Sequence, residues 1–223
     1  MNKCFWRVLS LALILCLLGG TANAAGICKA ETEEKKIALT FDDGPSPLYT
    51  EKLLALLEKH GVKATFFIIG ENAAENPEPV RAIAAAGHEI GNHTYTHAHL
   101  NKLSAERVKE EIEKTEKILT ELAGTRPHLF RPPGGLTSPG ADRLIEEAGL
   151  RSILWSVDTR DWSLPPASRI IRTVREEISP GAILLFHDLN RKGLPTLDAL
   201  EILLPELLAQ GYEFVTVSEL LAG

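Results

Sequence analysis

The feature that most constrains the fold is a regular alternation between short apolar runs and amphipathic helical patterns. Apolar runs of four to seven residues are typical of buried strands, and the stretches between them have one apolar face. Regular alternation of this kind implies parallel strands joined by right-handed helical crossovers. The expected strands are IALTF (37–41), ATFFIIG (64–70), HEIGNHT (88–94), HLFRPPGG (128–135), SILWSVD (152–158), AILLFHD (182–188) and YEFVTVSEL (212–220).

Helix signals fall between these strands. Thr50 is expected to cap a helix that ends at Gly61, and Ser104 is expected to cap a long helix. The Glu and Lys residues between the buried positions of that long helix are interpreted as a solvated face. Its buried stripe is Val108, Ile112, Thr115, Leu119 and Leu122, and further helices are expected at 79–86, 139–148, 168–178 and 196–210.

The number of strands favours one particular architecture. The chain shows no linker and no internal repeat at a fixed period, so we expect a single domain. An open doubly wound sheet and a closed barrel both fit the order of elements. No Gly-x-Gly-x-x-Gly follows the first strand, which disfavours a dinucleotide-binding fold. We therefore predict a β/α barrel of seven or eight strands.

The N-terminus has the pattern of a secretory signal peptide. Lys3 and Arg7 precede an apolar run over 8–18, which is too short to span a bilayer comfortably, and Ala22-Asn23-Ala24 resembles a cleavage site. We predict a signal peptide over 1–24, a short polar tail over 25–35 and one domain over 36–223. The alternative is an uncleaved segment that anchors the chain to a membrane. In either case the domain acts outside the cytoplasm, secreted or within the cell envelope.

Charge and cysteine content exclude several classes of partner and fold. The whole chain has 24 basic and 30 acidic residues, and residues 1–24 contain two basic residues and no acid. The remainder therefore has 22 basic and 30 acidic residues, a net charge of −8, which argues against nucleic acid or an anionic membrane as the main partner. Cys28 is the one cysteine after residue 24, so an intramolecular disulfide is excluded there. We expect a monomer.

Ionisable residues stand at the ends of five of the seven expected strands, after apolar runs. The pair Asp42-Asp43 ends the first strand, and polar residues end the third, fourth, fifth and sixth strands: NHTYTH (92–97), RPPGG (131–135), DTRDW (158–162) and HD (187–188). In parallel α/β folds, chemistry gathers at the carboxyl ends of the strands. An isolated Asp-Asp-Gly-Pro would be a solvated turn, but this repetition indicates an active site.

Two of these strand ends suggest a metal site. His93 and His97 are four residues apart, and two histidines with one carboxylate form a common catalytic zinc set. Consecutive residues at a strand end point to different sides, so Asp42 and Asp43 can divide the work. One would bind the cation, which relieves the repulsion of the pair, and the other would face the open coordination position. The spacing leaves open which aspartate does which.

Together, TFDDGP, HTYTH, RPPGG, DTRDW and LLFHD resemble the five motifs of the polysaccharide deacetylase family, carbohydrate esterase family 4. They occur in the family's order from Thr40 to Asp188. The resemblance implies a distorted seven- or eight-stranded β/α barrel. It also implies removal of acetyl groups, mostly from N-acetylglucosamine polymers or acetylated xylan, with one divalent metal ion.

The resemblance also implies a role for each motif residue. Asp42 would be the general base, oriented by Arg131, and His187 would be the general acid, held protonated by Asp161. A zinc ion, or cobalt as the alternative, would be held by Asp43, His93 and His97.

Three further residues would contact the substrate. The backbone N–H of Gly134 would face the developing oxyanion, and Trp162 and Leu185 would form walls for the acetyl methyl group. The family usually has a larger residue, often Tyr, at the position of Gly134, so one wall of the substrate groove differs here.

The sequence therefore predicts a metal-dependent hydrolase that removes N-acetyl groups from N-acetylglucosamine-type residues of an extracellular polysaccharide. Peptidoglycan is the first expected substrate, followed by chitooligosaccharide or an exopolysaccharide. Two alternatives remain. The first is another single-metal hydrolase such as a phosphoesterase, although no Gly-rich phosphate cradle or further carboxylate cluster is evident. The second is a glycan-binding homologue that has lost catalysis.

Overall fold

A computed structural model describes residues 26–188 and 195–222. The predicted signal peptide over 1–24 lies outside the described residues. Within these two ranges, no helix combines the length and the apolar character that a membrane span requires.

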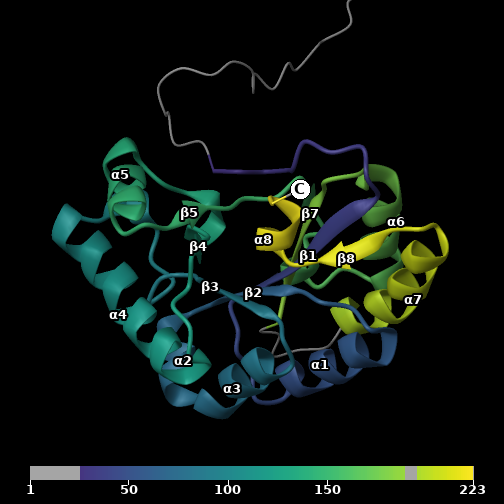
Figure 1. Ribbon diagram of the computed structural model, residues 1–223, viewed down its shortest axis with the longest axis horizontal. Helices are drawn as coiled ribbons and strands as arrows, with labels where there is room; N and C mark the ends of the chain where they lie inside the picture. The colour runs from purple at the N-terminus through teal and green to yellow at the C-terminus, as the bar shows by residue number, and fades with distance from the viewer. Residues whose placement is uncertain (1–25, 189–194, 223) are drawn as a thin grey trace, which may run out of the picture.

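The described residues confirm the predicted β/α barrel as one domain in which parallel strands curl inside an arc of helices (Figure 1). The order across the sheet is β5-β4-β3-β2-β1-β7-β6, and β8 pairs with the start of β1. The barrel is open between its two edge strands, β5 and β6. The strands are β1 (Lys36–Asp42), β2 (Thr65–Ile68), β3 (Glu89–Asn92), β4 (Leu129–Phe130), β5 (Arg151–Ser152), β6 (Val157–Asp158), β7 (Ile183–His187) and β8 (Glu213–Val215).

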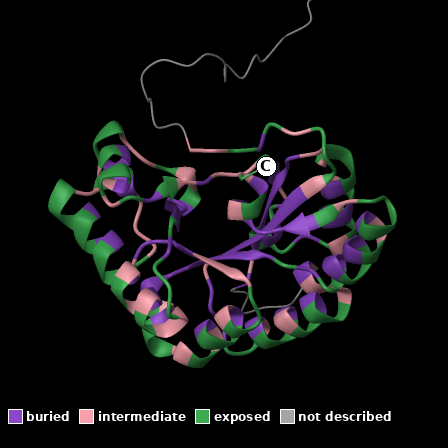
Figure 2. Ribbon diagram, in the orientation of Figure 1, coloured by how far each residue is buried: buried purple, intermediate pink, exposed green. Residues whose placement is uncertain are grey.

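Helices cover the outside of the sheet and turn their exposed faces to solvent, except α8, which packs with the inner cluster (Figure 2). The predicted cap of α4 is confirmed, because the Ser104 hydroxyl accepts from the Arg107 N–H at 3.4 Å. Thr50 lies inside α1 instead of capping it, and α2 was not predicted. The helices are α1 (Tyr49–His60), α2 (Gly70–Glu75), α3 (Pro77–Ala85), α4 (Ala105–Ala123), α5 (Pro139–Glu147), α6 (Ala167–Glu177), α7 (Pro195–Ala209) and α8 (Val217–Leu220).

Strand alternation divides the core into an outer and an inner part. Alternate residues such as Phe41 and Phe186 pack outward with the helices in the largest apolar cluster. Ala38 and Ile183 point inward and join a smaller cluster inside the barrel. By the same alternation, the later inward positions of β1 and β7 are Thr40, Asp42, Leu185 and His187. The barrel interior therefore changes from apolar to polar toward the carboxyl ends of its strands.

The predicted strand over 152–158 is wrong, because this stretch forms two strands. β5 pairs with β4, whereas β6 pairs with β7, so the two lie on opposite edges of the sheet. The N-terminal segment links the end of β5 to the start of β7, with isolated bridges from Ile27 to Ile153 and from Lys29 to Ala182. Ala30 is buried, and Ile27 packs against the inner cluster. The stretch expected as a polar tail is therefore partly packed into the barrel.

Candidate active site

Asp42 ends β1 inside the barrel and is 3% exposed. Its Oδ1 accepts a hydrogen bond from Arg131 Nη1 at 2.7 Å, and its Oδ2 lies 3.8 Å from His93 Nε2. The Arg131 guanidinium is fully buried and lies 4.0 Å from the ring centroid of Phe67. It also donates to Thr40 Oγ1 and to two backbone carbonyls beyond β5. The guanidinium thus fixes one oxygen of Asp42 and leaves the other facing the neighbouring histidines.

Asp43, His93 and His97 converge beside Asp42. Asp43 Oδ1 lies 3.4 Å from His93 Nε2 and 3.2 Å from His97 Nε2, and the three candidate ligand atoms lie within 4.8 Å of one another. Strand alternation alone would send Asp42 and Asp43 to opposite sides. Asp43 instead has a φ of 71°, a left-handed conformation that leaves the strand and turns its carboxylate toward the histidines.

The donor set of this cluster fits a divalent cation. Asp43 Oδ1 is buried and has no hydrogen-bond partner in the described residues, and the two nearest groups are imidazole nitrogens. His93 Nδ1 lies 2.7 Å from the Arg131 carbonyl, which can only accept, so Nδ1 bears the proton and Nε2 offers a lone pair. Two imidazoles and one carboxylate are a catalytic zinc set. These residues can therefore hold one divalent cation.

Electrostatics at the cluster also favour a positive charge. Burial would raise the pKa of Asp43, but the close contacts with His93 and His97 outweigh burial and hold that pKa well below its usual range. The same contact with Asp43 raises the pKa of His97. A cation at this position would take the place of the protons on the imidazoles.

His187 ends β7 and faces the same end of the barrel. Its Nδ1 lies 2.7 Å from Asp161 Oδ1, and its backbone N–H donates to Asp161 Oδ2 at 2.9 Å. Thr196 Oγ1, from α7, also donates to Oδ2 at 2.6 Å. Burial would lower the pKa of His187, but the hydrogen bond and charge of Asp161 outweigh burial and raise it to about 9. Asp161 therefore orients the His187 ring and stabilises its protonated form.

The three expected substrate-contacting residues have different surroundings. Gly134 lies in the 3-10 turn Pro133–Gly135 with a φ of 61°, and a Cβ built there would come no closer than 3.8 Å to another residue. Trp162 follows Asp161 directly and is 60% exposed, whereas Leu185 is 4% exposed within β7. The exposed indole of Trp162 thus lies next in sequence to Asp161, the partner of His187. The space around the Cα of Gly134 is not filled by other side chains.

Sequence reasoning missed the buried carboxylate of Asp188, which follows His187 directly. Its Oδ2 accepts from Thr50 Oγ1 at 2.8 Å, and its Oδ1 has no partner in the described residues. Burial raises the pKa of Asp188 to about 7. A Cβ built on Gly44 would lie 2.2 Å from this carboxylate, so Asp188 packs directly under the turn that follows Asp43. The HD pair at the end of an apolar run was its only sequence signal.

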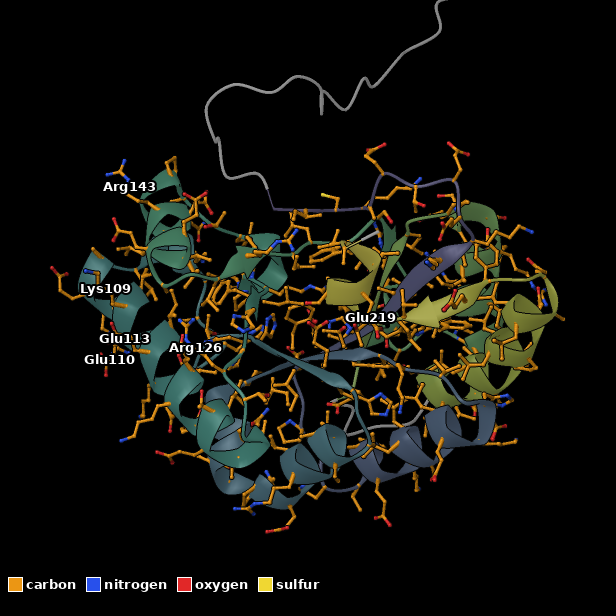
Figure 3. The ribbon with its side chains drawn as sticks, viewed as in Figure 1. Lys109, Glu110, Glu113, Arg126, Arg143 and Glu219 are labelled. Carbon is orange, nitrogen blue, oxygen red and sulfur yellow. The ribbon has the colours of Figure 1, made fainter. Side chains whose placement is uncertain are left out.

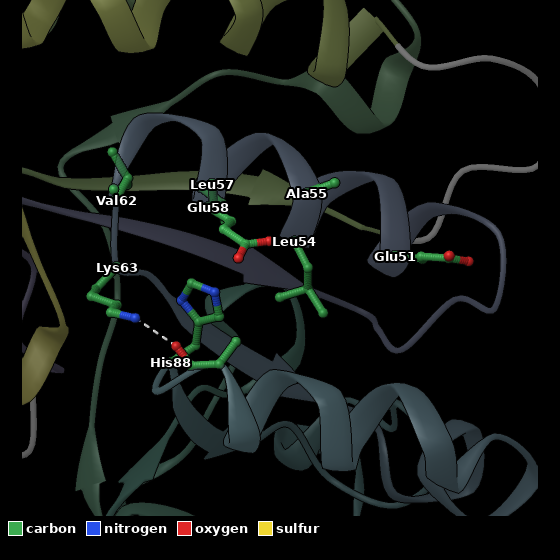
Figure 4. Close-up of a pocket in the computed structure, with 10 residues that line it drawn as sticks. Glu51, Leu54, Ala55, Leu57, Glu58, Val62, Lys63 and His88 are labelled. Atoms are coloured by element: carbon green, nitrogen blue, oxygen red, sulfur yellow. Dashed lines mark hydrogen bonds between the residues drawn. The ribbon is translucent and has the colours of Figure 1, made fainter.

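A separate groove lies at the opposite end of the barrel, where β2 and β3 begin. It is lined by Leu54, Val62, Lys63 and His88 among others (Figure 4). Lys63 Nζ donates to the Ala86 carbonyl at 2.5 Å, and His88 Nδ1 accepts from the Ala64 N–H at 3.2 Å. Burial lowers the pKa of His88 to about 4. His88 is therefore a neutral packing residue, and the candidate chemistry lies at the carboxyl ends of the strands.

Comparison with known proteins gives one consistent family. The sequence pattern that defines the polysaccharide deacetylase family matches residues 29–153. A peptidoglycan-N-acetylglucosamine deacetylase of Bacillus cereus is 43% identical over 190 residues, which cover 84% of this chain and 89% of that protein. Other relatives are longer, and the chain spans 42% of the length of some of them.

Solved structures show the same fold. One is a peptidoglycan N-acetylglucosamine deacetylase in complex with 4-naphthalen-1-yl-N-oxidanyl-benzamide. It is 39% identical, with a TM-score of 0.86 over 89% of this chain and 94% of that one. Another is a CE4 family pseudoenzyme from Bacillus anthracis, which is 31% identical, with a TM-score of 0.83 over 90% of this chain and 70% of that one.

Proposed function

Because the chain belongs to the polysaccharide deacetylase family, we propose that it is a metal-dependent hydrolase that removes N-acetyl groups from N-acetylglucosamine-type residues of a cell-envelope glycan. The observation that supports this most is the convergence of three functions at one end of the barrel. A ligand set, an oriented carboxylate and a charged imidazole all lie there. Peptidoglycan is the first expected substrate, since similar proteins bear that name, and chitooligosaccharide or an exopolysaccharide comes next.

The proposed metal ligands are Asp43, His93 and His97. When bound there, a divalent cation polarises the acetyl carbonyl and lowers the pKa of water from about 15.7 toward about 7. This chemistry is needed because an amide carbonyl is a poor electrophile and neutral water is a poor nucleophile.

The chain's own residues move the protons. Asp42 Oδ2 accepts a proton from the attacking water, while Arg131 holds Oδ1 and keeps the carboxylate oriented. The Gly134 N–H donates to the developing oxyanion, and one such donor contributes roughly 3 kcal/mol. His187 then gives its proton to the departing amine nitrogen, while Asp161 keeps the ring oriented. Trp162 and Leu185 line the space for the acetyl methyl. The products are acetate and a free amino sugar.

The location of the substrate agrees with the N-terminal sequence. We propose that residues 1–24 direct the chain out of the cytoplasm, where it acts secreted or in the cell envelope. The acidic net charge beyond residue 24 suits a neutral or mixed-charge glycan better than a nucleic acid. We propose that the enzyme acts as a monomer.

One comparison raises a second candidate function. A structural neighbour is described as a pseudoenzyme, so this fold also occurs without activity. A catalytically inactive glycan-binding role would be expected with a defect in the metal ligands or in the proton-transfer groups. Here Asp42 and His187 are both present, each with a buried charged partner. These ion pairs favour the catalytic proposal.

The test is acetate release from purified peptidoglycan, chitooligosaccharide and exopolysaccharide, measured before chelation, after it and after adding zinc back. We expect release from at least one glycan, lost with the chelator and restored by zinc. Glycan binding without release in the zinc-loaded protein would support the inactive role. Hydrolysis of a phosphate ester such as p-nitrophenyl phosphate, without acetate release, would support the phosphoesterase alternative.

A further inference from the structure

The loop that bears both proposed histidine ligands has two non-glycine residues in left-handed backbone conformations. It runs from His93 to His97, directly after β3, and Thr94 and His97 have φ values of 65° and 57°. Left-handed conformations are uncommon for residues other than glycine, and they persist only when the surroundings fix them. Something outside the loop must therefore hold it in this shape.

The carboxylate of Glu111 on α4 makes three hydrogen bonds to this loop. Its Oε2 accepts from the backbone N–H of Tyr95 at 2.8 Å and from that of Thr96 at 2.7 Å, and its Oε1 accepts from Thr96 Oγ1 at 2.8 Å. Arg107 Nη2 lies 3.5 Å from the same Oε1. An ionised carboxylate only accepts hydrogen bonds, so all four neighbours suit its charge.

Glu111 also corrects the prediction that the Glu and Lys residues of α4 form a solvated face. It is 2% exposed and lies next to Ile112 on the buried side of the helix. Glu110 and Glu113 are exposed and project from the outer side of α4 (Figure 3). A carboxylate is costly to bury unless it is hydrogen-bonded, so the loop contacts account for its place in the core.

The other side of the loop is held by backbone groups. The N–H groups of Gly70 and Glu71, at the start of α2, donate to the carbonyls of Thr94 and Tyr95, both at 2.9 Å. Asn92 Oδ1 accepts from the Thr94 N–H at 2.9 Å. These contacts fix the carbonyls of Thr94 and Tyr95 and the N–H of Thr94. Glu111 fixes the N–H groups of Tyr95 and Thr96. Within the described residues, Glu111 is the carboxylate that accepts from the backbone of the segment between the two imidazoles, and the Lys114 ammonium contacts the same segment only through the Tyr95 ring, 3.5 Å from its centroid.

We propose that Glu111 is a positioning residue that presets the His93–His97 loop for metal binding and so increases the affinity of the site. This inference rests on the proposed function, because it takes His93 and His97 as ligands. Groups that orient ligands typically contribute 10- to 100-fold to metal affinity. Without Glu111, binding a cation would have to order the loop, and that cost lowers the affinity.

The test measures Zn²⁺ dissociation constants of the full chain by chelator competition, without any glycan. Glu111→Ala should weaken zinc binding by about 10- to 100-fold. Glu111→Gln should recover part of the affinity, because its one amide oxygen can still accept from the loop backbone. Thr96→Val removes a single bond to Glu111 and should weaken zinc binding less. In the double variant with Glu111→Ala, Thr96→Val should add nothing further.

Two variants control for charge and for stability. Glu113→Ala removes an exposed carboxylate from the same helix, and its zinc affinity should match the wild type. Leu119→Ala removes a fully buried side chain of α4 from the main apolar cluster. It should lower the thermal midpoint of the metal-free protein and leave the zinc dissociation constant within about twofold.

The outcomes separate this inference from the proposed function. If the wild type binds zinc, His97→Ala does not, and the Glu111 variants bind as tightly as the wild type, the positioning role is refuted and the metal site stands. Glu111→Ala can fail to fold. In that case, equal zinc affinity in Glu111→Gln, Thr96→Val and the wild type refutes the positioning role of Glu111. If His97→Ala binds zinc like the wild type, the ligand set itself is wrong.

Discussion

The pairing of Asp161 with His187 gives the sharpest test of the proposed chemistry. The pKa of His187 rises from 6.5 to about 9 in the folded chain, which corresponds to about 3 kcal/mol in favour of the imidazolium. Burial opposes this rise, so the attraction comes from carboxylates, with the 2.7 Å contact to Asp161 as the largest favourable contribution. Asp161→Asn keeps the shape of the site and removes that charge.

The expected result is a change in the pH dependence of kcat/KM. A general acid must be protonated, so activity falls as the pH rises through the pKa of His187. In Asp161→Asn the main attraction is lost while burial remains, so the alkaline limb should move to lower pH. If the pKa returns to its ordinary 6.5, only about one tenth of the rings are protonated at pH ~7.5. A bound cation also lowers this pKa, so the alkaline limb of the loaded wild type should lie below pH 9.

The same pair predicts a pH-dependent contribution to stability. The folded pKa of His187 lies above its ordinary value, so the ion pair stabilises the fold fully below pH 6.5. That contribution is lost as the pH rises through about 9. The difference in unfolding free energy between the wild type and Asp161→Asn should therefore be largest in acid and shrink toward pH 10.

The assay combines pH–rate profiles on an acetylated glycan, metal analysis and urea unfolding at several pH values. Thr196→Val is the matched control, since it removes one neutral hydrogen bond to Asp161 and keeps the charge. Its alkaline limb should stay near that of the wild type. An unmoved alkaline limb in Asp161→Asn, with metal content intact, would show that another group is the acid.

Three further substitutions test the other parts of the site. Asp42→Asn should keep its metal, measured by elemental analysis, and lose activity by a factor of about 10² to 10⁴; loss of the metal would mean that the two aspartates have exchanged roles. His93→Ala should lose most of its metal, and a fully loaded, active variant would exclude this ligand set. Gly44→Ala would place its Cβ 2.2 Å from the Asp188 carboxylate, so its thermal midpoint and zinc affinity should both fall; unchanged values would show that the turn relaxes freely.

Much of the fold was predictable because buried strands appear in the sequence as apolar runs. Runs such as AILLFHD combine apolar residues with a polar end, and β7 is buried until it reaches His187. The same logic located the strand ends that meet at the site. The sequence pattern does not show which strands pair with one another. The run SILWSVD has four apolar residues among seven, and its periodicity does not reveal that β5 and β6 lie on opposite edges.

The local backbone conformation at Asp43 could not be predicted from the sequence either. The alternation rule assigned Asp42 and Asp43 to different sides of β1, and it holds only while the backbone stays extended. The positive φ of Asp43 breaks that rule, so both carboxylates reach the histidines. A residue directly before Gly-Pro can take many conformations, and the sequence does not select one.

The groups that support the site were missed for a common physical reason. Each lies on an element distant in sequence from the residue it holds. Thr196 on α7 donates to Asp161, and Glu111 on α4 accepts from the ligand loop. Site residues at strand ends can be recognised in the sequence because a charged residue follows an apolar run. Supporting residues sit inside helices, where their only signal is a polar residue at a position of the buried stripe. Glu111 follows Val108 by three residues and precedes Thr115 by four, so it shared their face. A charged residue on a buried helical face must have a partner in the core, and such positions are where the support of an active site can be sought in sequence.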